Sequence, residues 1–372
     1  MSTEPVRRRT LCVIAYVGIE NPATRLRIVQ FYPDLEAEGW TIRPFYVPHT
    51  DGSARTWTIR ELFDAMRSSD VVFIQRVLTW WLLPLLRLAG RPVVFDVDDA
   101  IHVIRQSQFE STVSPTTMRQ RLTVMYRRAV RGGAVYSSRK RLFDRIIRRA
   151  TALIVGNENL ADYVRSHADR FVVLPTAVPV ETFPVRQVED RRPVRIGWIG
   201  VPSNLYHLRL LESVFAELAR RYGDGVRLVI VSSRGLDGLP IDTEFVRWSL
   251  ETESAETARF DIGIMPLQDD LFSRGKCSFK AIYCMGHGVP VVISPVGMNT
   301  QLVDNGHNGF LASSDEEWIA ALVALIDDPA LRERLGRSAR ETIERRYGAD
   351  QVFQQLRDVL ADVSATEAPA HE

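Results

Sequence analysis

Cysteine, long apolar runs and an excess of either charge are all scarce in this sequence. The 372 residues include three cysteines, Cys12, Cys277 and Cys284, which are too few and too scattered for a disulfide framework or a zinc site. Lysine and arginine number 47 against 46 acidic residues, so the formal net charge is +1. This balance argues against extensive nucleic-acid binding, and the cysteine usage favours a reducing compartment.

No segment has the length and composition needed to enter or cross a membrane. Residues 1–10 are polar and arginine-bearing, without the apolar core of a signal peptide. The longest apolar stretch, Trp80–Ala89, is interrupted by Pro84 and Arg87 and is too short to span a bilayer. We therefore expect a cytoplasmic protein, with peripheral contact at the inner membrane face left open.

Short runs rich in Val and Ile alternate with longer segments of helical periodicity. Runs that do not alternate with polar residues are typical of strands buried on both faces of a parallel sheet. The repeated pattern predicts an α/β protein built from βα units. The predicted strands are Leu11–Val17, Val71–Ile74, Val93–Val97, Leu153–Val155, Phe171–Leu174, Val194–Ile199, Leu228–Val231, Ile262–Met265, Val289–Ile293 and Phe310–Ala312.

The pattern starts twice, which predicts two Rossmann-like doubly wound domains facing across a cleft. One strand runs into Gly18 and a helix over 24–38, and another runs into Gly200 and a helix over 206–221. Such turns point backbone amides at an anion, although a glycine there can equally serve the tight turn alone. The expected divisions are 1–185, 186–348, a C-terminal helix at 349–363 that returns to the first domain, and a disordered tail at 364–372.

The segment from Ser273 to Asn299 carries the densest chemistry. Arg274, Lys276 and Ser278 lead into a short helix that contains Lys280 and Tyr283. Cations beside the free amides of a helix start can hold a diphosphate. Lys280 lies four residues after Lys276, so both can face one side of that turn. A solvated basic loop is the alternative.

This segment resembles the C-terminal signature of group 1 (family 4) glycosyltransferases, which have the GT-B fold. The resemblance continues through Val296–Asn299, Leu302–Gly306, Asn308–Leu311 and Arg346–Gly348, and includes Leu153–Tyr163 in the first half. It implies a retaining transfer of a sugar from a nucleotide-sugar donor. The donor would bind mainly the second domain and the acceptor the first.

One departure from the family lies in the same loop. Many members carry two glutamates eight residues apart, one for the donor sugar and one for the nucleotide ribose. These places fall on Gly275 and Tyr283. We therefore expect Tyr283 to contact the donor in a different way, and the usual glutamate roles do not carry over.

Asp98 and Asp99 follow a buried strand of the first half, at the expected cleft edge. Family members often carry a histidine near Asp98 that touches the donor sugar. An aspartate there can accept hydroxyl hydrogen bonds or act as a base. Asp99 has the alternative of capping the next helix. The Asp96–Asp98 spacing also resembles a metal-binding pair of another glycosyltransferase fold, but the surrounding sheet pattern belongs to GT-B. Lys276 and Lys280 could neutralise a leaving diphosphate, so neither a metal nor a cofactor is expected.

Further candidate donor contacts come from the two glycine turns. Arg25 and Arg27 follow Gly18, and Ser203 and Asn204 follow Gly200. The arginines could reach a diphosphate or be solvated, and Pro202 could make the second turn merely rigid.

The stretch 101–150 is strongly basic. It holds twelve Arg or Lys residues against Glu110 and Asp144, with apolar residues at helical spacing. Basic amphipathic helices dock on anionic membranes or lipid diphosphates, although the apolar stripe can instead pack on the sheet. Trp80 and Trp81 could extend such a surface.

The sequence thus predicts a glycosyltransferase with catalytic Asp98, Asp99 and Lys280. Its partners would be a nucleotide-sugar donor and an unknown acceptor, lipid-linked saccharides among them, and not nucleic acid. Two alternatives stay open: a non-catalytic GT-B partner subunit, and another GT-B enzyme such as a nucleotide-sugar epimerase.

Overall fold

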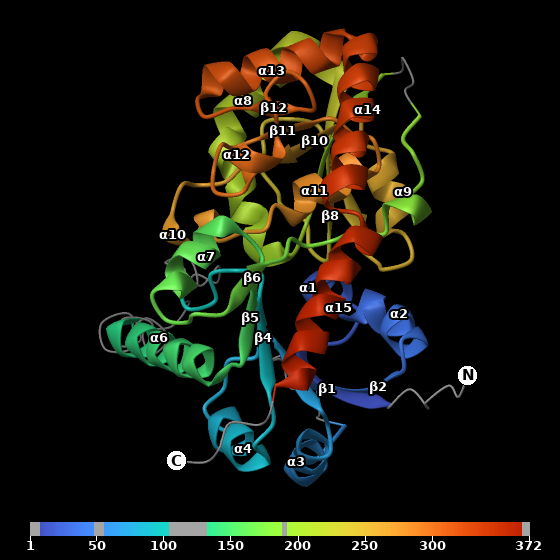
Figure 1. Ribbon diagram of the computed structural model, residues 1–372. Helices are drawn as coiled ribbons and strands as arrows, with labels where there is room; N and C mark the ends of the chain where they lie inside the picture. The colour runs from blue at the N-terminus through green and yellow to red at the C-terminus, as the bar shows by residue number, and fades with distance from the viewer. Residues whose placement is uncertain (1–7, 48–55, 104–131, 188–191, 367–372) are drawn as a thin grey trace, which may run out of the picture. The chain divides into compact units, whose positions relative to one another are not determined.

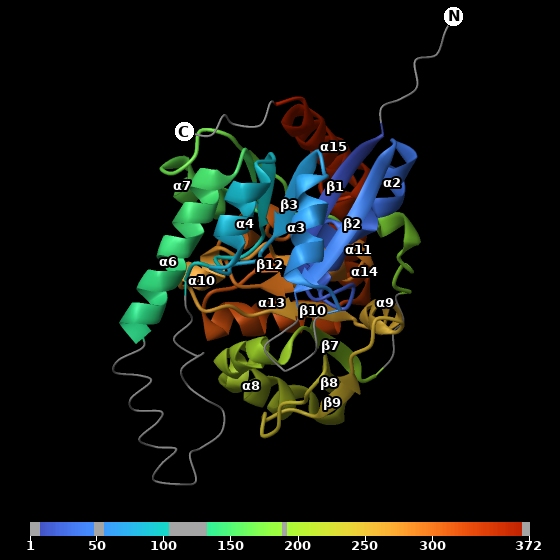
Figure 2. The same ribbon diagram turned by 90° about the horizontal axis from the view of Figure 1, so that it is seen from below.

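The computed structural model describes residues 8–47, 56–103, 132–187 and 192–366, with the backbone alone for 132–137. The chain divides into two compact units. The first contains the residues up to Pro175 together with those from Phe353 onward, and the second runs from Thr176 to Val352. Figures 1 and 2 label the elements of both units.

The first unit is built on a six-stranded parallel sheet in the order β2-β1-β3-β4-β5-β6. The register pairs Leu11 of β1 with Val71 of β3, and Phe95 of β4 with Leu153 of β5. The strands are β1 (Arg9–Tyr16), β2 (Trp40–Val47), β3 (Val71–Gln75), β4 (Val93–Val97), β5 (Ala152–Val155) and β6 (Phe171–Val173). The helices are α1 (Pro22–Arg27), α2 (Tyr32–Ala37), α3 (Ile59–Arg67), α4 (Leu82–Ala89), α6 (Gly132–Arg149) and α7 (Glu158–Arg165), with the short 3-10 helix η1 (Val29–Phe31).

The second unit repeats the architecture with the order β12-β11-β10-β7-β8-β9, again parallel. Its strands are β7 (Val194–Ile199), β8 (Val226–Ser232), β9 (Thr243–Arg247), β10 (Ile262–Met265), β11 (Val291–Ile293) and β12 (Phe310–Leu311). Its helices are η4 (Val180–Thr182), η5 (Pro202–Leu211), α8 (Glu212–Tyr222), η6 (Gly223–Gly225), α9 (Glu253–Ala258), α10 (Leu271–Arg274), α11 (Phe279–Gly286), α12 (Asn299–Leu302), α13 (Asp315–Asp327) and α14 (Pro329–Arg346), before α15 (Ala349–Ala365).

Each sheet is buried between layers of helix, which explains the apolar runs. All residues of β3, β4 and β7 are buried, and one apolar cluster fills each unit. Polar residues then set the helix ends. Thr58 and Glu61 form a capping box on α3, and Ser314 and Glu317 form one on α13. The prediction of two doubly wound parallel sheets is confirmed.

Two helices predicted as single segments are broken. Residues 24–38 form α1, η1 and α2: α1 ends at Arg27, where Ile28 leaves the helical region with a φ of -143°, and Pro33 stands in the first turn of α2, where its missing N–H is tolerated. Residues 206–221 begin in the tighter η5 and become α-helical only at Glu212. The turns after β1 and β7 are therefore followed by short, irregular helices.

The units divide at 175/176, whereas the sequence suggested 185/186. Residues beyond Pro175 are fastened to the second unit, since Arg340 donates to the carbonyl of Val180 at 3.0 Å and Arg186 pairs with the buried Asp261. The predicted linker at 184–193 lies partly outside the described residues. Helix α15 extends to Ala365, so the first residues of the predicted tail are helical, and Phe353 stacks on Phe31 of the first unit with ring centroids 5.8 Å apart.

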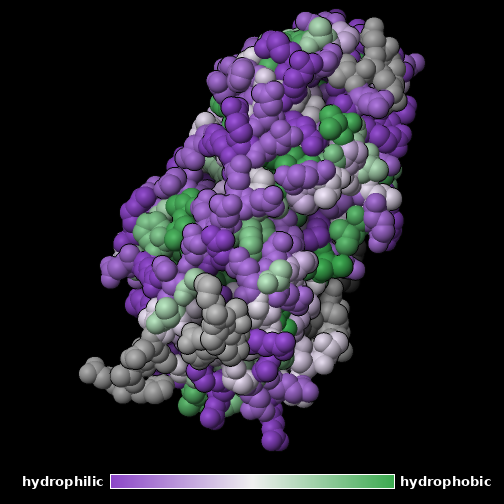
Figure 3. All heavy atoms as spheres, turned by 45° about the vertical axis from the view of Figure 1, so that its right-hand side comes forward, coloured by the Kyte–Doolittle hydropathy of each residue, from purple (hydrophilic) through white to green (hydrophobic). Residues whose placement is uncertain are grey.

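One face of the molecule carries few exposed apolar groups (Figure 3). On the face shown in Figure 3, hydrophilic residues predominate and hydrophobic ones form small separate groups. Among the described residues, every helix is too short or too polar to cross a membrane.

Candidate functional site

The strand orders place a ligand-binding position in each sheet. In doubly wound sheets, ligands bind beyond the carboxyl ends of the strands where the strand order reverses. In the second unit this point lies between β7 and β10, and in the first it lies between β1 and β3. Gly200 directly follows β7 and Gly18 lies just beyond β1, so both predicted glycine turns stand at these points.

Gly200 and Lys280 meet at the switch point of the second unit. A Cβ atom added to Gly200 would lie 2.5 Å from Cε of Lys280 and 2.9 Å from the ring of Trp198, so only glycine leaves room for the lysine chain. The ammonium of Lys280 stands 5.5 Å from the centroid of that ring. Gly200 and Lys280, which were predicted separately and lie 80 residues apart in the sequence, are thus in contact, and Lys280 is half-buried.

Ser278 shapes the start of α11. Its φ of 51° lies in the left-handed region, and its hydroxyl donates to Oδ1 of Asn299 at 2.6 Å instead of capping the helix. Asn299 is itself held by donation to the carbonyl of Ser294 at 2.8 Å. The side chain of Ser278 therefore turns away from the first amides of α11, at the helix end that favours an anion.

Lys276 and Arg274 occupy different surroundings from Lys280. Because α11 begins at Phe279, Lys276 precedes the helix, and the predicted sharing of one helical turn is wrong. Lys276 is buried, with its ammonium 4.8 Å from the ring centroid of Phe272. Arg274 is half-exposed and binds both carboxylate oxygens of Asp269 at 2.6 and 2.9 Å, which speaks against the predicted diphosphate contact.

The neighbouring strand ends contribute polar groups. Ser203 is exposed and Asn204 is buried in the turn after β7. Two buried polar atoms here form no hydrogen bond among the described residues. They are Oδ1 of Asn204, which can only accept, and the hydroxyl of Ser232, the last residue of β8. Buried polar atoms are rarely left without a partner, so these two are suited to a ligand's hydroxyl or phosphate groups. Ser232 was not predicted, because a single serine at a strand end gives no signal.

In the first unit, Asp98 and Asp99 share one cation, Arg76. Nε of Arg76 lies 3.3 Å from Asp98 and Nη2 lies 3.1 Å from Asp99. Burial raises the pKa of Asp98 to about 6, although the charge of Arg76 opposes this shift. No helix follows Asp99 directly in the described chain, so its carboxylate serves Arg76 and not a helix cap. The pair forms an acid–base group just past β4.

Arg27 and Asp96 form a buried ion pair behind this group. Nε of Arg27 donates to Asp96 at 3.1 Å, and Nη1 donates to the carbonyl of Leu174 at 2.6 Å. Both side chains are almost fully buried. Arg27 is therefore structural, and Asp96 is not available for a metal-binding pair with Asp98. Arg25 lies at the surface and donates to the carbonyl of Ile19 at 2.7 Å.

Residues with strained backbone conformations lie beside the candidate site residues of both units. Among the described residues, Val17, Arg76 and Ser278 are the non-glycine residues with positive φ. Val17 and Arg76 directly follow β1 and β3, the two strands of the first switch point, and Ser278 precedes α11. Such conformations cost about 1–3 kcal/mol each and persist where surroundings enforce them, often at functional sites.

Comparisons with known proteins classify the second unit. The family model described as "Glycosyl transferases group 1" matches residues 193–328, which include Gly200, Ser278 and Lys280. Residues 193–328 form a group 1 glycosyltransferase domain. The predicted family resemblance is thus confirmed.

A curated protein is similar to about half of the chain. The D-inositol 3-phosphate glycosyltransferase of Stackebrandtia nassauensis is 27% identical over 231 residues, which cover 53% of this chain and 51% of that protein. The chain thus spans about half the length of this curated relative.

Solved structures support the fold. Sucrose-phosphate synthase of Thermosynechococcus elongatus matches with a TM-score of 0.65 at 15% identity, covering 96% of this chain and 100% of that one. HepE of Anabaena, solved with UDP, matches with a TM-score of 0.62 at 15% identity, covering 95% and 100%. Both matches cover nearly the whole of this chain, and together with the two parallel sheets they confirm the predicted fold class.

Tyr283 of the glycosyltransferase domain lies in the interior. Its hydroxyl donates to Glu253 at 3.2 Å, and its ring packs edge-on against Phe183 with centroids 4.9 Å apart. Glu253 also accepts from Nε1 of Trp248 at 2.7 Å. This placement speaks against the predicted donor contact by Tyr283. The buried Glu253 gave no signal in the sequence, since it belongs to an ordinary polar stretch.

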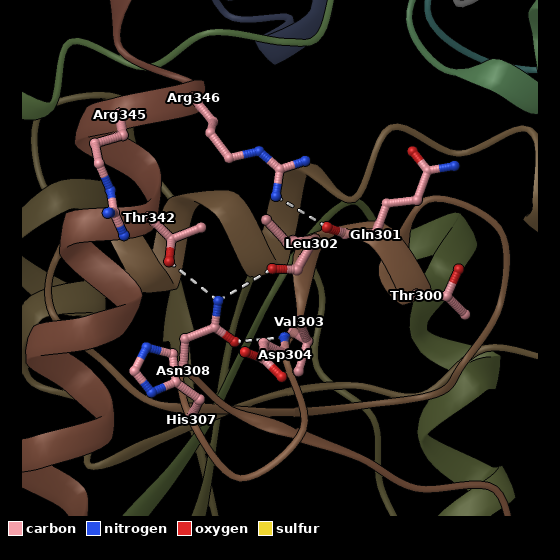
Figure 4. A pocket seen from close by; sticks show the side chains of 10 residues that line it. All are labelled: Thr300, Gln301, Leu302, Val303, Asp304, His307, Asn308, Thr342, Arg345 and Arg346. Atoms are coloured by element: carbon pink, nitrogen blue, oxygen red, sulfur yellow. Dashed lines mark hydrogen bonds between the residues drawn. The ribbon is translucent and has the colours of Figure 1, made fainter.

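Figure 4 shows a separate hollow of about 670 Å³ in the glycosyltransferase domain. The carboxamide of Asn308 bridges it, donating to the carbonyl of Leu302 at 3.2 Å and to Thr342 at 3.1 Å while accepting from the amide of Asp304 at 2.8 Å. None of the predicted catalytic or donor residues lines it. The family motifs here fasten the loop to α14 and so serve the fold. The lining residues are Thr300, Gln301, Leu302, Val303, Asp304, His307, Asn308, Thr342, Arg345 and Arg346.

Proposed function

We propose that the protein transfers a sugar from a nucleotide-sugar donor to an acceptor hydroxyl, with retention of the anomeric configuration. The observation that carries the proposal is the contact of Gly200 with Lys280 at the switch point of the matched domain. A fixed cation beside a helix start suits the diphosphate that leaves during transfer.

The donor side is assigned to the second unit. Lys280 and the first amides of α11 would neutralise the diphosphate, and Asn204 and Ser203 would contact the rest of the donor. Charge supplied in this way removes the need for a metal, and we propose that neither a metal nor a further cofactor takes part. The structure of HepE with UDP makes UDP-sugars the first donors to test.

The acceptor side is assigned to the first unit. When the acceptor oxygen bonds to the anomeric carbon, the bond to the diphosphate breaks and the acceptor loses a proton. We assign this proton to the carboxylate of Asp98, whose raised pKa makes it a base near neutral pH. We further propose a lipid-linked acceptor and a peripheral contact with the inner face of the membrane.

A non-catalytic partner subunit is the second candidate. It is favoured by Gly275 and by the interior position of Tyr283, the two places where many family members carry glutamates. Such a subunit could keep the fold without binding a donor.

Calorimetry with UDP, UDP-glucose and other nucleotide sugars separates these functions. The transferase should bind at least one nucleotide sugar and release its diphosphate when an acceptor is added. Absence of binding across the panel would favour the partner subunit. Conversion of the donor into an isomer, without any transfer, would instead identify an epimerase.

A further inference from the structure

Helices α4 and α6 of the first unit enclose a basic hollow of about 580 Å³. Figure 2 shows the two helices beside one another. Half of the lining residues are arginines, the others are apolar, and none is acidic. We name this the α4–α6 surface, and its residues are Trp80, Leu83, Pro84, Arg87, Leu88, Arg145, Arg148 and Arg149.

The arginines of this surface lack neutralising partners in the described chain. Neither Arg87, Arg145 nor Arg148 forms an ion pair there. Other exposed arginines, such as Arg60, Arg220 and Arg337, pair with a carboxylate on their own helix. Arg149 donates to the carbonyl of Leu86 at 3.1 Å. Four like charges around one hollow favour an anionic occupant.

Apolar side chains lie among these charges. Helix α4 buries Leu82 and Leu86 against the sheet, yet it leaves Leu88 69% exposed. Trp80 is 43% exposed, and the guanidinium of Arg145 stands 5.2 Å from its ring centroid. Trp and Arg beside exposed Leu are typical of surfaces that rest at the boundary between lipid headgroups and acyl chains.

Arg139 and Lys140, nearer the start of α6, form polar contacts within the first unit. Arg139 donates to the carbonyl of Ile101 at 2.9 Å, and Lys140 pairs with Asp144 at 3.0 Å. Arg127, Arg128 and Arg131 lie outside the described residues. The predicted membrane contact through 101–150 is therefore best sought at the C-terminal half of α6, together with α4.

We propose that the α4–α6 surface docks the protein on an anionic lipid bilayer. The arginines would lie at the level of the lipid phosphates, and Trp80 and Leu88 would enter the boundary below them. Charge complementarity and the exposed apolar groups both favour lipid, because a nucleic acid or an acidic protein would leave Leu88 in water. The proposal rests on the proposed function only for its purpose, which is access to a lipid-linked acceptor.

Flotation of the full chain with vesicles tests the proposal. At low salt the protein should float with vesicles of phosphatidylcholine and phosphatidylglycerol, and stay behind with phosphatidylcholine alone. Each basic residue near an anionic surface contributes about fivefold to binding, so Arg87→Gln, Arg145→Gln and Arg148→Gln together should weaken partitioning roughly 100-fold. Leu88→Asp should weaken it without loss of fold, because this side chain is exposed.

A matched variant controls for net charge. Arg60→Gln, Arg220→Gln and Arg337→Gln together remove the same three charges from α3, α8 and α14, and should float like the wild type. Equal loss in both triple variants would overturn the proposal, as would wild-type protein that stays soluble or that prefers a DNA duplex to the vesicles. Donor binding measured in parallel keeps this result distinct from the proposed activity, since the α4–α6 surface lies in the other unit.

Discussion

Lys280 is the residue whose removal should affect catalysis most. It is held between Gly200 and Trp198, so its charge is fixed before the donor binds. Lys280→Ala should lower kcat by about 10²–10³-fold, or roughly 2–4 kcal/mol, as for other preorganised electrostatic contacts. Transfer rates at saturating donor measure this. Arg274→Ala is the matched control and should change kcat less than about twofold, because Arg274 already pairs with Asp269 at the surface.

Gly200 should control the position of Lys280 more than the stability of the fold. In Gly200→Ala the new methyl group would meet the far end of the lysine chain, which can move aside, and the ring of the buried Trp198 at 2.9 Å, which must shift. We expect a moderate fall in the melting temperature from the Trp198 contact, while kcat drops toward the value of Lys280→Ala. Gly225→Ala, whose added Cβ has only ordinary contacts, should leave both unchanged. A large loss of stability with normal turnover of the folded fraction would contradict this assignment.

Asp98 should set the pH dependence. With a pKa of about 6 it is mostly protonated at pH 5 and ionised at pH 7, so kcat/KM should rise through pH 6. Asp98→Asn should abolish this rise. Asp99→Asn should move it to lower pH, because the Asp99 charge raises the pKa of Asp98 while Arg76 lowers it. An unchanged profile in Asp98→Asn would assign the proton to another group.

The raised pKa of Asp98 also makes the free energy of unfolding depend on pH. The ordinary pKa of Asp98, 3.8, applies in the unfolded chain, so between about pH 4 and 6 the folded state binds more protons. The contribution of Asp98 to the free energy of unfolding therefore falls as pH rises through this window. Asp98→Asn should flatten that part of the stability profile.

At the scale of elements, the Arg27–Asp96 pair joins α1 to β4. Arg27→Ala would leave a buried carboxylate without its partner and should cost about 3–5 kcal/mol. Urea unfolding followed by circular dichroism measures the shift in midpoint. Arg25→Ala, on the same helix but at the surface, should cost less than about 1 kcal/mol. Recovery of stability in Arg27→Met with Asp96→Leu would show that apolar packing can replace this ion pair in the fold.

The strands that the sequence did not reveal are the edge strands β2 and β9. Both lie at the border of their sheets and are only partly buried, with patterns such as Thr243–Arg247 that mix polar and apolar residues. The rule used for prediction detects apolar runs, which the other two edge strands, β6 and β12, still have and which β2 and β9 lack. β4, β7 and β10, inside the sheets, were predicted with their observed bounds.

The candidate site was predictable where backbone geometry decides it. Gly200 and Lys280 were found separately from a turn and a helix start, and the fold brings them together. Tyr283 was placed by family register and Arg274 as a cation before a helix start. Their actual partners, Glu253 and Asp269, depend on tertiary contacts that periodicity does not contain. Arg27 was similarly mistaken for a surface residue, since only the sheet shows that it is buried.

At the scale of the whole molecule, transfer should survive removal of divalent metal. Lys280 and the start of α11 offer positive charge to the leaving diphosphate, and Asp96, which could have completed a ligand pair with Asp98, is bound by Arg27. After excess EDTA and gel filtration, the transfer rate should therefore stay within about twofold of the untreated rate, because the charge that stabilises the transition state is covalently part of the chain. Wild type and Lys280→Ala should be treated in parallel, with and without added Mg²⁺ or Mn²⁺. The opposite outcome has two parts: EDTA lowers the rate of the wild type and either ion restores it, whereas neither ion restores the rate of Asp98→Asn. That outcome would assign the diphosphate to a metal held by Asp98 and leave Lys280 a secondary role.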